Sequence, residues 1–459
     1  MFLHCALFFF PARGTLRRMA HASDAPTRPP IPLSPLTLAD FKSETVRGAP
    51  GFFRVGQTFA GQWWLIDAED RAFFSRGVNA VGSGVRPALA AMADSFPPMG
   101  DADALDSAAA TRARLRAWRV NTLGPWSAPD VAGREFASTE TLEFTKVAPQ
   151  TTIRLGGALV PDVFDPEWIE ACDRQAAEQC APSRAEAALI GYFTDDELNW
   201  AQLPAEENQA SATRPGRPSL LQICLSLEPS FPAYHAAWEF TLAAHGGDWA
   251  SLVRAWDLDL PNKEALRQRT LADAPLASAG YRRDQERFSR EFARRYFAAS
   301  AAAIRRHDPH HLILGCRFGA SPGPAILAEC AAPHVDVLSL SQGELSLCDE
   351  VTGPVLAGAF SWVKESFTAR TPGATDGWTS VERMLQRGRA TLARAFAHPA
   401  LIGYAWECWA DGPDDRPPFG RGLVHVDGSE AREHTELLSD LNARADFLRR
   451  AAAPNSPVP

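Results

Sequence analysis

Three acids follow a short apolar segment near the middle of the chain. Residues 188–193 read Ala-Leu-Ile-Gly-Tyr-Phe, and Asp195, Asp196 and Glu197 come one residue later. A carboxylic acid beside aromatic groups such as Tyr192 would be poorly solvated, which raises its pKa toward the range that a general acid needs. Capping of a following helix would account for one of the acids, but not for all three. The segment therefore predicts a catalytic acid at the end of a strand.

The elements that must position these acids alternate along the chain. Apolar runs separated by helical patterns predict βα units and a parallel sheet, and eight such units predict a (β/α)8 barrel, a TIM barrel. A doubly wound sheet is the alternative, but no glycine-rich phosphate loop follows the first strand. In a barrel, catalytic groups collect at the carboxyl ends of the strands, where the three acids would lie. The expected strands fall within residues 72–79, 120–123, 152–156, 188–193, 311–315, 335–340, 354–358 and 401–406.

The chain is expected to divide into a barrel and shorter flanking segments. A β-hairpin extension precedes the barrel, and a helical insertion on its catalytic face is too long for an ordinary βα loop. The apolar start lacks a basic region ahead of it, which does not fit a secretory signal, and Met19 is an alternative start. We expect a cytoplasmic protein on this basis. The expected segments are 1–36 (disordered or untranslated), 37–76 (hairpin extension), 77–450 (barrel), about 200–300 within it (insertion) and 451–459 (disordered tail).

Composition narrows the function classes. The 459 residues carry a formal charge of −9, which disfavours binding to nucleic acid. No apolar run is long enough to span a membrane. The eight cysteines form no CxxC pair, so we expect no zinc site, no disulfide framework, no metal and no cofactor. The 13 tryptophans suit a protein that stacks flat apolar faces against a ligand, although core packing uses most of them.

Several stretches together resemble the agarase-like and β-galactosidase-like glycoside hydrolases of clan A. That family consists of retaining enzymes on eight-stranded barrels, so the resemblance implies a barrel that acts on a β-linked oligo- or polysaccharide. The order and spacing of the stretches carry the resemblance, and each one alone is weak. They are residues 63–79, 115–126, 161–166, 190–197, 308–315 and 403–424.

The resemblance assigns roles to individual residues. Glu197 takes the place of the general acid/base, and Asp196 replaces the asparagine that usually precedes it. An ionised Asp can only accept hydrogen bonds, whereas Asn can also donate, so this change bears on sugar preference. Trp406 matches the tryptophan that floors the sugar pocket. The remaining expected substrate-binding residues are Asp195, Trp126, Asn79, Tyr192 and Arg317, the last with a barrel salt bridge as the alternative.

One departure from the family concerns the nucleophile. A retaining glycosidase needs a second carboxylate about 5–5.5 Å from the first. The seventh strand reads Pro-Val-Leu-Ala-Gly-Ala-Phe-Ser over 354–361, so Ala359 stands where the family has the nucleophilic glutamate. A relocated acid, Glu344, Glu365 or Glu407, could serve as the base of an inverting mechanism. The sequence thus leaves open an active hydrolase, a carbohydrate enzyme of altered mechanism and a sugar-binding barrel without catalysis.

Overall fold

We describe the fold from a computed structural model of the chain. The described residues are 34–82, 107–133, 135–155, 158–196, 198, 218–319, 322–341, 348–349, 351–363, 380–412, 415 and 417–452. Across these ranges the helices are too short or too polar to cross a bilayer.

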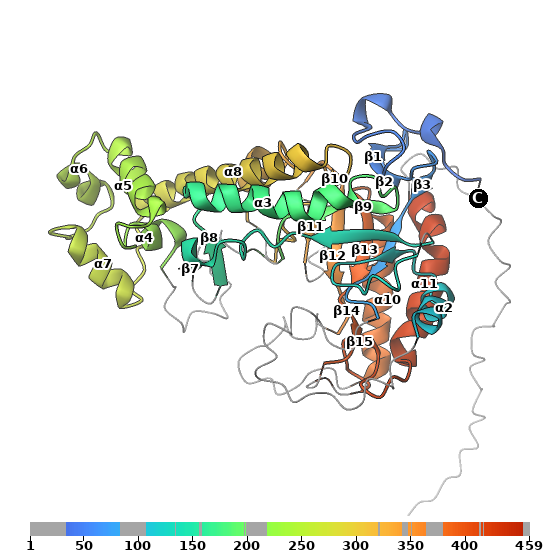
Figure 1. Ribbon diagram of the computed structural model, residues 1–459. Coiled ribbons are helices and arrows are strands. Elements are labelled where there is room, and N and C mark those ends of the chain that lie inside the picture. Colours follow the sequence, from blue (N-terminus) through green and yellow to red (C-terminus); the bar gives the residue numbers. More distant parts are fainter. Residues whose placement is uncertain are drawn as a thin grey trace, which may run out of the picture. The chain divides into compact units, whose positions relative to one another are not determined.

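A parallel eight-stranded sheet forms the centre of the fold (Figure 1). The strands lie in the order β10-β9-β6-β5-β4-β13-β12-β11, and every pairing is parallel. A parallel bridge between Phe318 and Leu340 links the two ends of this order. The curled sheet with its helices is consistent with the α/β barrel expected from the sequence. The strands are β4 (Ser75–Val78), β5 (Thr122–Leu123), β6 (Ala137–Thr141), β9 (Leu189–Phe193), β10 (Leu312–Ile313), β11 (Leu338–Leu340), β12 (Val355–Phe360) and β13 (Leu401–Trp406).

The sequence prediction of the third barrel strand along the chain was wrong. The strand expected at 152–156 is β7 (Thr152–Leu155), which pairs antiparallel with β8 (Ala158–Pro161) outside the eight-stranded sheet. Its place is taken by β6, whose sequence Ala-Ser-Thr-Glu-Thr is mostly polar. A strand without an apolar run gives no hydrophobic signal, and the prediction therefore chose the neighbouring apolar segment.

Helices flank the sheet. The long α8 packs along α3, and α10 packs against α11 (Figure 1). Side-chain caps at Asp165, Asp248, Asn262 and Ser278 start four of the helices by accepting a backbone N–H. The α-helices are α2 (Ala108–Ala117), α3 (Pro166–Ser183), α4 (Leu220–Cys224), α5 (Pro232–Ala244), α6 (Trp249–Ala255), α7 (Lys263–Leu271), α8 (Ala279–His307), α10 (Val381–Ala397) and α11 (Arg432–Ala451).

Shorter elements complete the described chain. An antiparallel sheet, β1-β2-β3, precedes the first barrel strand, and β14 pairs with β15 after the last. These elements are η1 (Leu38–Asp40), η2 (Ser43–Thr45), β1 (Arg54–Gln57), β2 (Trp63–Ile66), β3 (Ala72–Phe73), η5 (Pro149–Thr151), the π-helical η6 (Ile326–Ala331), β14 (Cys408–Ala410) and β15 (Gly422–Val424).

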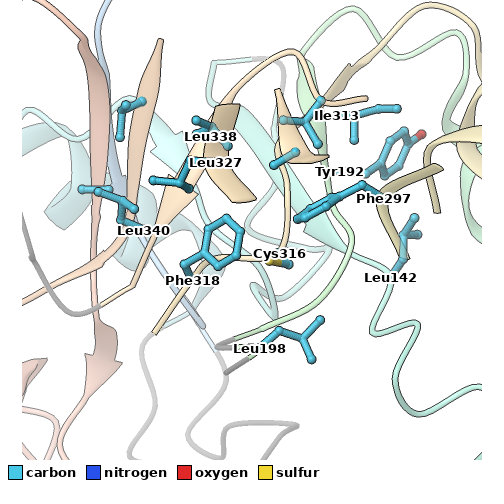
Figure 2. Packing of buried hydrophobic residues seen from close by; sticks show 14 of the residues in the cluster. Leu142, Tyr192, Leu198, Phe297, Ile313, Cys316, Phe318, Leu327, Leu338 and Leu340 are labelled. Atoms are coloured by element: carbon cyan, nitrogen blue, oxygen red, sulfur yellow. The ribbon is translucent and has the colours of Figure 1, made fainter. Parts of the chain in front are cut away.

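Buried apolar side chains fall into two clusters on opposite faces of the sheet. The inner cluster holds residues from the parallel strands together with Phe53, Val55 and Leu65 of the β1-β2 region. The outer cluster lies between the strands and the helices, and Figure 2 shows part of it, with Tyr192 and Phe297 among its members. Because side chains alternate along a strand, membership of a cluster tells which face a residue points to. The inner cluster is Phe53, Val55, Leu65, Ala137, Ile190, Phe193, Leu312, Leu314, Val337, Leu356 and Ile402.

Candidate active site

The acids that follow β9 do not share one environment. Asp195 is buried, whereas Asp196 is partly exposed, its side chain about a third accessible. Glu197, the expected acid/base, lies outside the described residues, as do Glu344 and Glu365. Of the three acids, the structure describes Asp195 and Asp196.

Asp195 is held by a helix on the outer face. Tyr296 of α8 donates its hydroxyl to Asp195 Oδ2 at 2.6 Å, and the Thr145 backbone N–H donates to Oδ1 at 3.0 Å. Complete burial outweighs these hydrogen bonds and raises the pKa of Asp195 to about 7. Tyr296 also stacks on Trp168 of α3, with ring centroids 6.0 Å apart. Asp195 thus ties the end of β9 to α8, and through Tyr296 to α3.

Arg317 occupies the mouth of the barrel just beyond β10. Its side chain is almost fully buried, and its Nε lies 3.2 Å from Asp196 Oδ1. The guanidinium also lies over the rings of Trp126 and Phe193, 5.3 Å from each centroid. Arg317 has a φ of 49°, a left-handed conformation that non-glycine residues rarely adopt, and its N–H donates to Ser339 Oγ at 2.9 Å. The salt-bridge alternative raised by the sequence is therefore present, and the ion pair includes a residue next to the expected acid.

The end of β12 meets Arg317 from the other side. A Cβ added to Gly358 would lie 3.1 Å from Arg317 Nε, so the absence of a side chain there lets the guanidinium approach. Ala359 follows and is buried. The pairing of β12 with β13 shifts register between Ala357 and Phe360, an irregularity typical of sites where a strand re-aims its side chains. The position expected for a nucleophile thus lies next to a cation.

Asn79 connects the first strand to this place. It follows β4, is buried, and donates from Nδ2 to the Gly358 carbonyl at 2.9 Å. Its Oδ1 has no hydrogen-bond partner among the described residues. That oxygen lies so close to Gly124, at the end of β5, that a Cβ there would come within 1.9 Å. Asn79 therefore lies against the same glycine, Gly358, as Arg317 does.

Tyr192 and Trp406, two aromatic residues expected to contact the sugar, belong to the outer cluster. Tyr192 points to the outer face, where its hydroxyl donates to Asp308 Oδ2 at 2.8 Å. Trp406 is fully buried, donates from Nε1 to the Arg421 carbonyl at 2.7 Å, and packs on Trp362 with centroids 4.5 Å apart. Neither ring reaches the barrel mouth, because strand alternation turns both toward the helices. The structure thus gives both side chains packing and hydrogen-bonding partners on the helix side of the strands.

Of the three acids that could replace the missing nucleophile, Glu407 lies within the described residues. Glu407 follows Trp406 at the end of β13, and only 4% of its surface is exposed. Its backbone N–H donates to the Phe360 carbonyl at 2.9 Å, and its Oε1 lies 3.4 Å from Nη1 of Arg421. Arg421 in turn donates from Nε to Asp415 Oδ1 at 2.9 Å. Burial alone would lower the pKa of Arg421. The hydrogen bond that Arg421 donates to Asp415 and the charge of Glu407 have a larger effect, so the pKa is raised.

The described residues contain no group of three or more His, Cys, Asp or Glu side chains arranged to hold a metal ion. The seven cysteines within the described ranges are buried and form no disulfide with one another. The side chains at the ends of these strands are instead suited to hydrogen bonding and charge. Asp196 pairs with Arg317, which lies over Trp126, and both Asn79 and Arg317 lie against Gly358. Glu407 is paired with Arg421.

Sequence reasoning missed the residues that support this group. Tyr296 stands in an aromatic series with Phe288 and Phe292 at helical spacing, and that series favours a core role. Ser339 and Arg421 carry no sequence pattern of their own. The position of Ser339 within the strand expected at 335–340 was the one available signal.

Comparison with known proteins finds similarity to agarases. No family model matches the chain. It is 23% identical over 441 residues to β-agarase A and 21% identical over 364 residues to β-agarase B, both of Vibrio sp. (strain JT0107). These matches cover 81% and 73% of this chain but 43% and 36% of the agarases, so the chain spans less than half the length of these curated relatives.

Solved structures agree on the fold. An exo-β-agarase superimposes with a TM-score of 0.64 at 18% identity, covering 88% of this chain and 66% of its own. A second agarase gives a TM-score of 0.63 at 17% identity, covering 91% of this chain and 68% of its own. At this identity the likeness shows that the chain has the fold of these agarases.

Proposed function

We propose that the protein is a glycoside hydrolase that acts on a β-linked polysaccharide of the agarose or β-galactan type, with Glu197 as the general acid/base. The observation that carries the proposal is the convergence of Asp196, Arg317 and Asn79 at the carboxyl ends of the strands. Of these residues, Asp196 immediately precedes Glu197 in the chain. The similarity to β-agarases along most of this chain supports it.

The surrounding segments have proposed roles in the same architecture. The β1-β3 sheet is a hairpin extension that closes the amino-terminal end of the barrel, since Phe53 and Leu65 share the inner cluster with Ile190 and Ile402. Helices α4 to α7 follow β9 in the chain, so they form an insertion on the catalytic face. The proposed boundaries are those expected from the sequence, with residues 77–450 as the barrel.

The binding groups suit a neutral sugar ring. Asn79 Oδ1 is a buried acceptor for a sugar hydroxyl, and Asp196 is an acceptor paired with the guanidinium of Arg317. Trp126 is half-buried, and its other ring face is a platform for the apolar face of a sugar. Glu197 would protonate the glycosidic oxygen as its bond to the anomeric carbon breaks. We propose a carbohydrate as the ligand and no metal or cofactor. A reducing compartment such as the cytoplasm suits the unpaired cysteines.

A sugar-binding barrel without catalysis is the second candidate, and Ala359 is the observation that favours it. The two candidates share a pocket but differ in turnover. We therefore expect both to bind agarose oligosaccharides, and only the hydrolase to cleave them.

Hydrolysis of agarose oligosaccharides and aryl β-galactosides tests the proposal. Glu197→Gln should abolish turnover while calorimetric binding of the oligosaccharide remains. Glu382→Gln, a change at an exposed acid in the first turn of α10, serves as the matched control and should leave both unchanged. Saturable binding without turnover by the wild-type protein would favour the sugar-binding barrel. Neither binding nor turnover would refute both candidates.

A further inference from the structure

Thr141 is the last residue of β6, one of the eight parallel strands. Its Cα pairs with that of Phe193 on β9, and Phe193 belongs to the inner cluster. The next residue along the chain, Leu142, belongs to the outer cluster. Because side chains alternate along a strand, Thr141 points to the inner face. It does so at the carboxyl end of the strand, where the binding groups of a barrel collect.

The hydroxyl of Thr141 is buried without a partner. Its Oγ1 makes no hydrogen bond to any of the described residues. A hydroxyl can donate one hydrogen bond and accept two, and most buried polar atoms in native proteins have at least one partner. Thr141 therefore has a hydrogen-bonding capacity that its neighbours in the fold do not use.

A second oxygen of this kind lies two strands away. Asn79 follows β4 and is buried, and its Oδ1 also has no partner among the described residues. The strands β4 and β6 are the two neighbours of β5, and Gly124, directly after β5, lies against Asn79 Oδ1. Trp126 comes two residues later. The two oxygens thus flank the strand that leads to the proposed stacking ring.

Arg317 connects the same strand ends. Its guanidinium lies over the rings of both Trp126 and Phe193, 5.3 Å from each centroid. Trp126 follows β5 and Phe193 ends β9, so this contact spans β6, the strand that ends at Thr141. The strand order therefore brings Asn79, Trp126 and Thr141 to consecutive strand ends.

We infer that Thr141 is a sugar-binding residue that contributes to substrate selection, an inference that rests on the proposed function. Thr141 Oγ1 bonds one hydroxyl of a sugar ring stacked on Trp126, and Asn79 Oδ1 accepts from another. All three groups are neutral, and sugar hydroxyls supply both the donors and the acceptors that they need. A sugar that lacks the hydroxyl bound by Thr141 would leave a buried polar group unpaired, so the site discriminates against it.

Calorimetric binding of an agarose oligosaccharide to three variants tests the inference. Thr141→Val removes the hydroxyl and keeps the branched shape, so it should weaken binding by about threefold to tenfold, the usual net contribution of a neutral hydrogen bond. Thr141→Ser keeps the hydroxyl and should retain the affinity. Thr241→Val is the matched control, because Thr241 has a buried Oγ1 without a partner among the described residues but lies in α5, which packs on α4, α6 and α8. That variant should bind like the wild-type protein, and circular dichroism confirms that each variant is folded.

Monodeoxy analogues of the same oligosaccharide test for the hydrogen bond itself. One analogue should bind the wild-type protein more weakly by the same factor that Thr141→Val causes. Its binding should become no weaker in Thr141→Val, because the analogue and the variant each remove one end of the same bond. A merely structural role of Thr141 would not couple the variant to one hydroxyl of the ligand.

The outcomes separate the inference from the proposed function. Unchanged affinity in Thr141→Val, an equal loss in Thr241→Val, or the lack of a coupled analogue would overturn the inference. Binding and turnover of the oligosaccharide by the wild-type protein would still support the proposed function in each of these cases. Absence of both in the wild-type protein would overturn the proposed function, and the inference with it.

Discussion

Replacing Asp195 with Asn is expected to change how stability depends on pH. The pKa of Asp195 rises from 3.8 to about 7, chiefly because the carboxyl is buried. The unfolded chain therefore releases its proton near pH 4, while the folded protein holds it until about pH 7. Since the folded state binds more protons in this window, the free energy of unfolding falls as pH rises from about 4 to about 7.

The size of the effect follows from the shift. About three pH units at about 1.4 kcal/mol each correspond to about 4 kcal/mol of stability that is present below pH 4 and lost above pH 7. Asn has nearly the shape of a protonated Asp. It can accept from the Thr145 N–H and donate to the Tyr296 hydroxyl oxygen. We expect Asp195→Asn to match the wild-type protein at pH 4 and to exceed its stability by up to about 4 kcal/mol at pH 8.

Urea unfolding at several pH values measures this difference. Asp165→Asn is the control, because Asp165 caps α3 near the surface and Asn caps a helix equally well. That variant should follow the wild-type pH dependence. If Asp195→Asn also follows it between pH 4 and 7, the carboxyl does not titrate in the buried setting and the reasoning fails.

Three further changes probe the barrel mouth and its support. Trp406→Ala should lower the free energy of unfolding in urea by about 3–5 kcal/mol, because the ring is fully buried. Oligosaccharide affinity, measured by calorimetry at low temperature, should not change. A selective loss of affinity would mean that Trp406 contacts the sugar. Arg317→Met should weaken oligosaccharide binding by about tenfold to a hundredfold, since hydrogen bonds to charged groups are worth about 1.5–3 kcal/mol; unchanged binding would mean that the Asp196 ion pair is only structural. Ala359→Glu should create or increase hydrolysis of an aryl β-galactoside with net retention, seen by NMR as a β-anomeric first product, whereas an unchanged rate would place residue 359 away from the anomeric carbon.

The strands show what the sequence can predict about this fold. Apolar runs such as 188–193 and 401–406 mark strands buried on both faces, and the structure has β9 and β13 there. The polar β6 carries no such run and was therefore missed. Composition alone does not distinguish a polar strand at the barrel centre from a loop.

The sequence indicates which strands end near the three acids, but not the direction of the side chains there. Asp195 and Tyr192 belong to the predicted segment, yet both point to the outer face. Which face a residue takes depends on where the strand alternation starts and on local irregularities, such as the register shift before Phe360. The Arg317 ion pair depends on a contact between the ends of β9 and β10, which no spacing along the chain specifies.

The two departures from the resembled family, at positions 196 and 359, are linked by Arg317. The guanidinium lies against Gly358, next to Ala359, and its Nε is 3.2 Å from Asp196. A glutamate at 359 and an asparagine at 196 would place one negative charge beside this cation. Alanine at 359 and aspartate at 196 also place one there, but from the opposite side of the barrel mouth. Because a buried cation without a counter-charge is costly, Asp196 stabilises Arg317 in a chain that has alanine at position 359. The ion pair therefore supplies this end of the barrel with a negative charge that residue 359 does not.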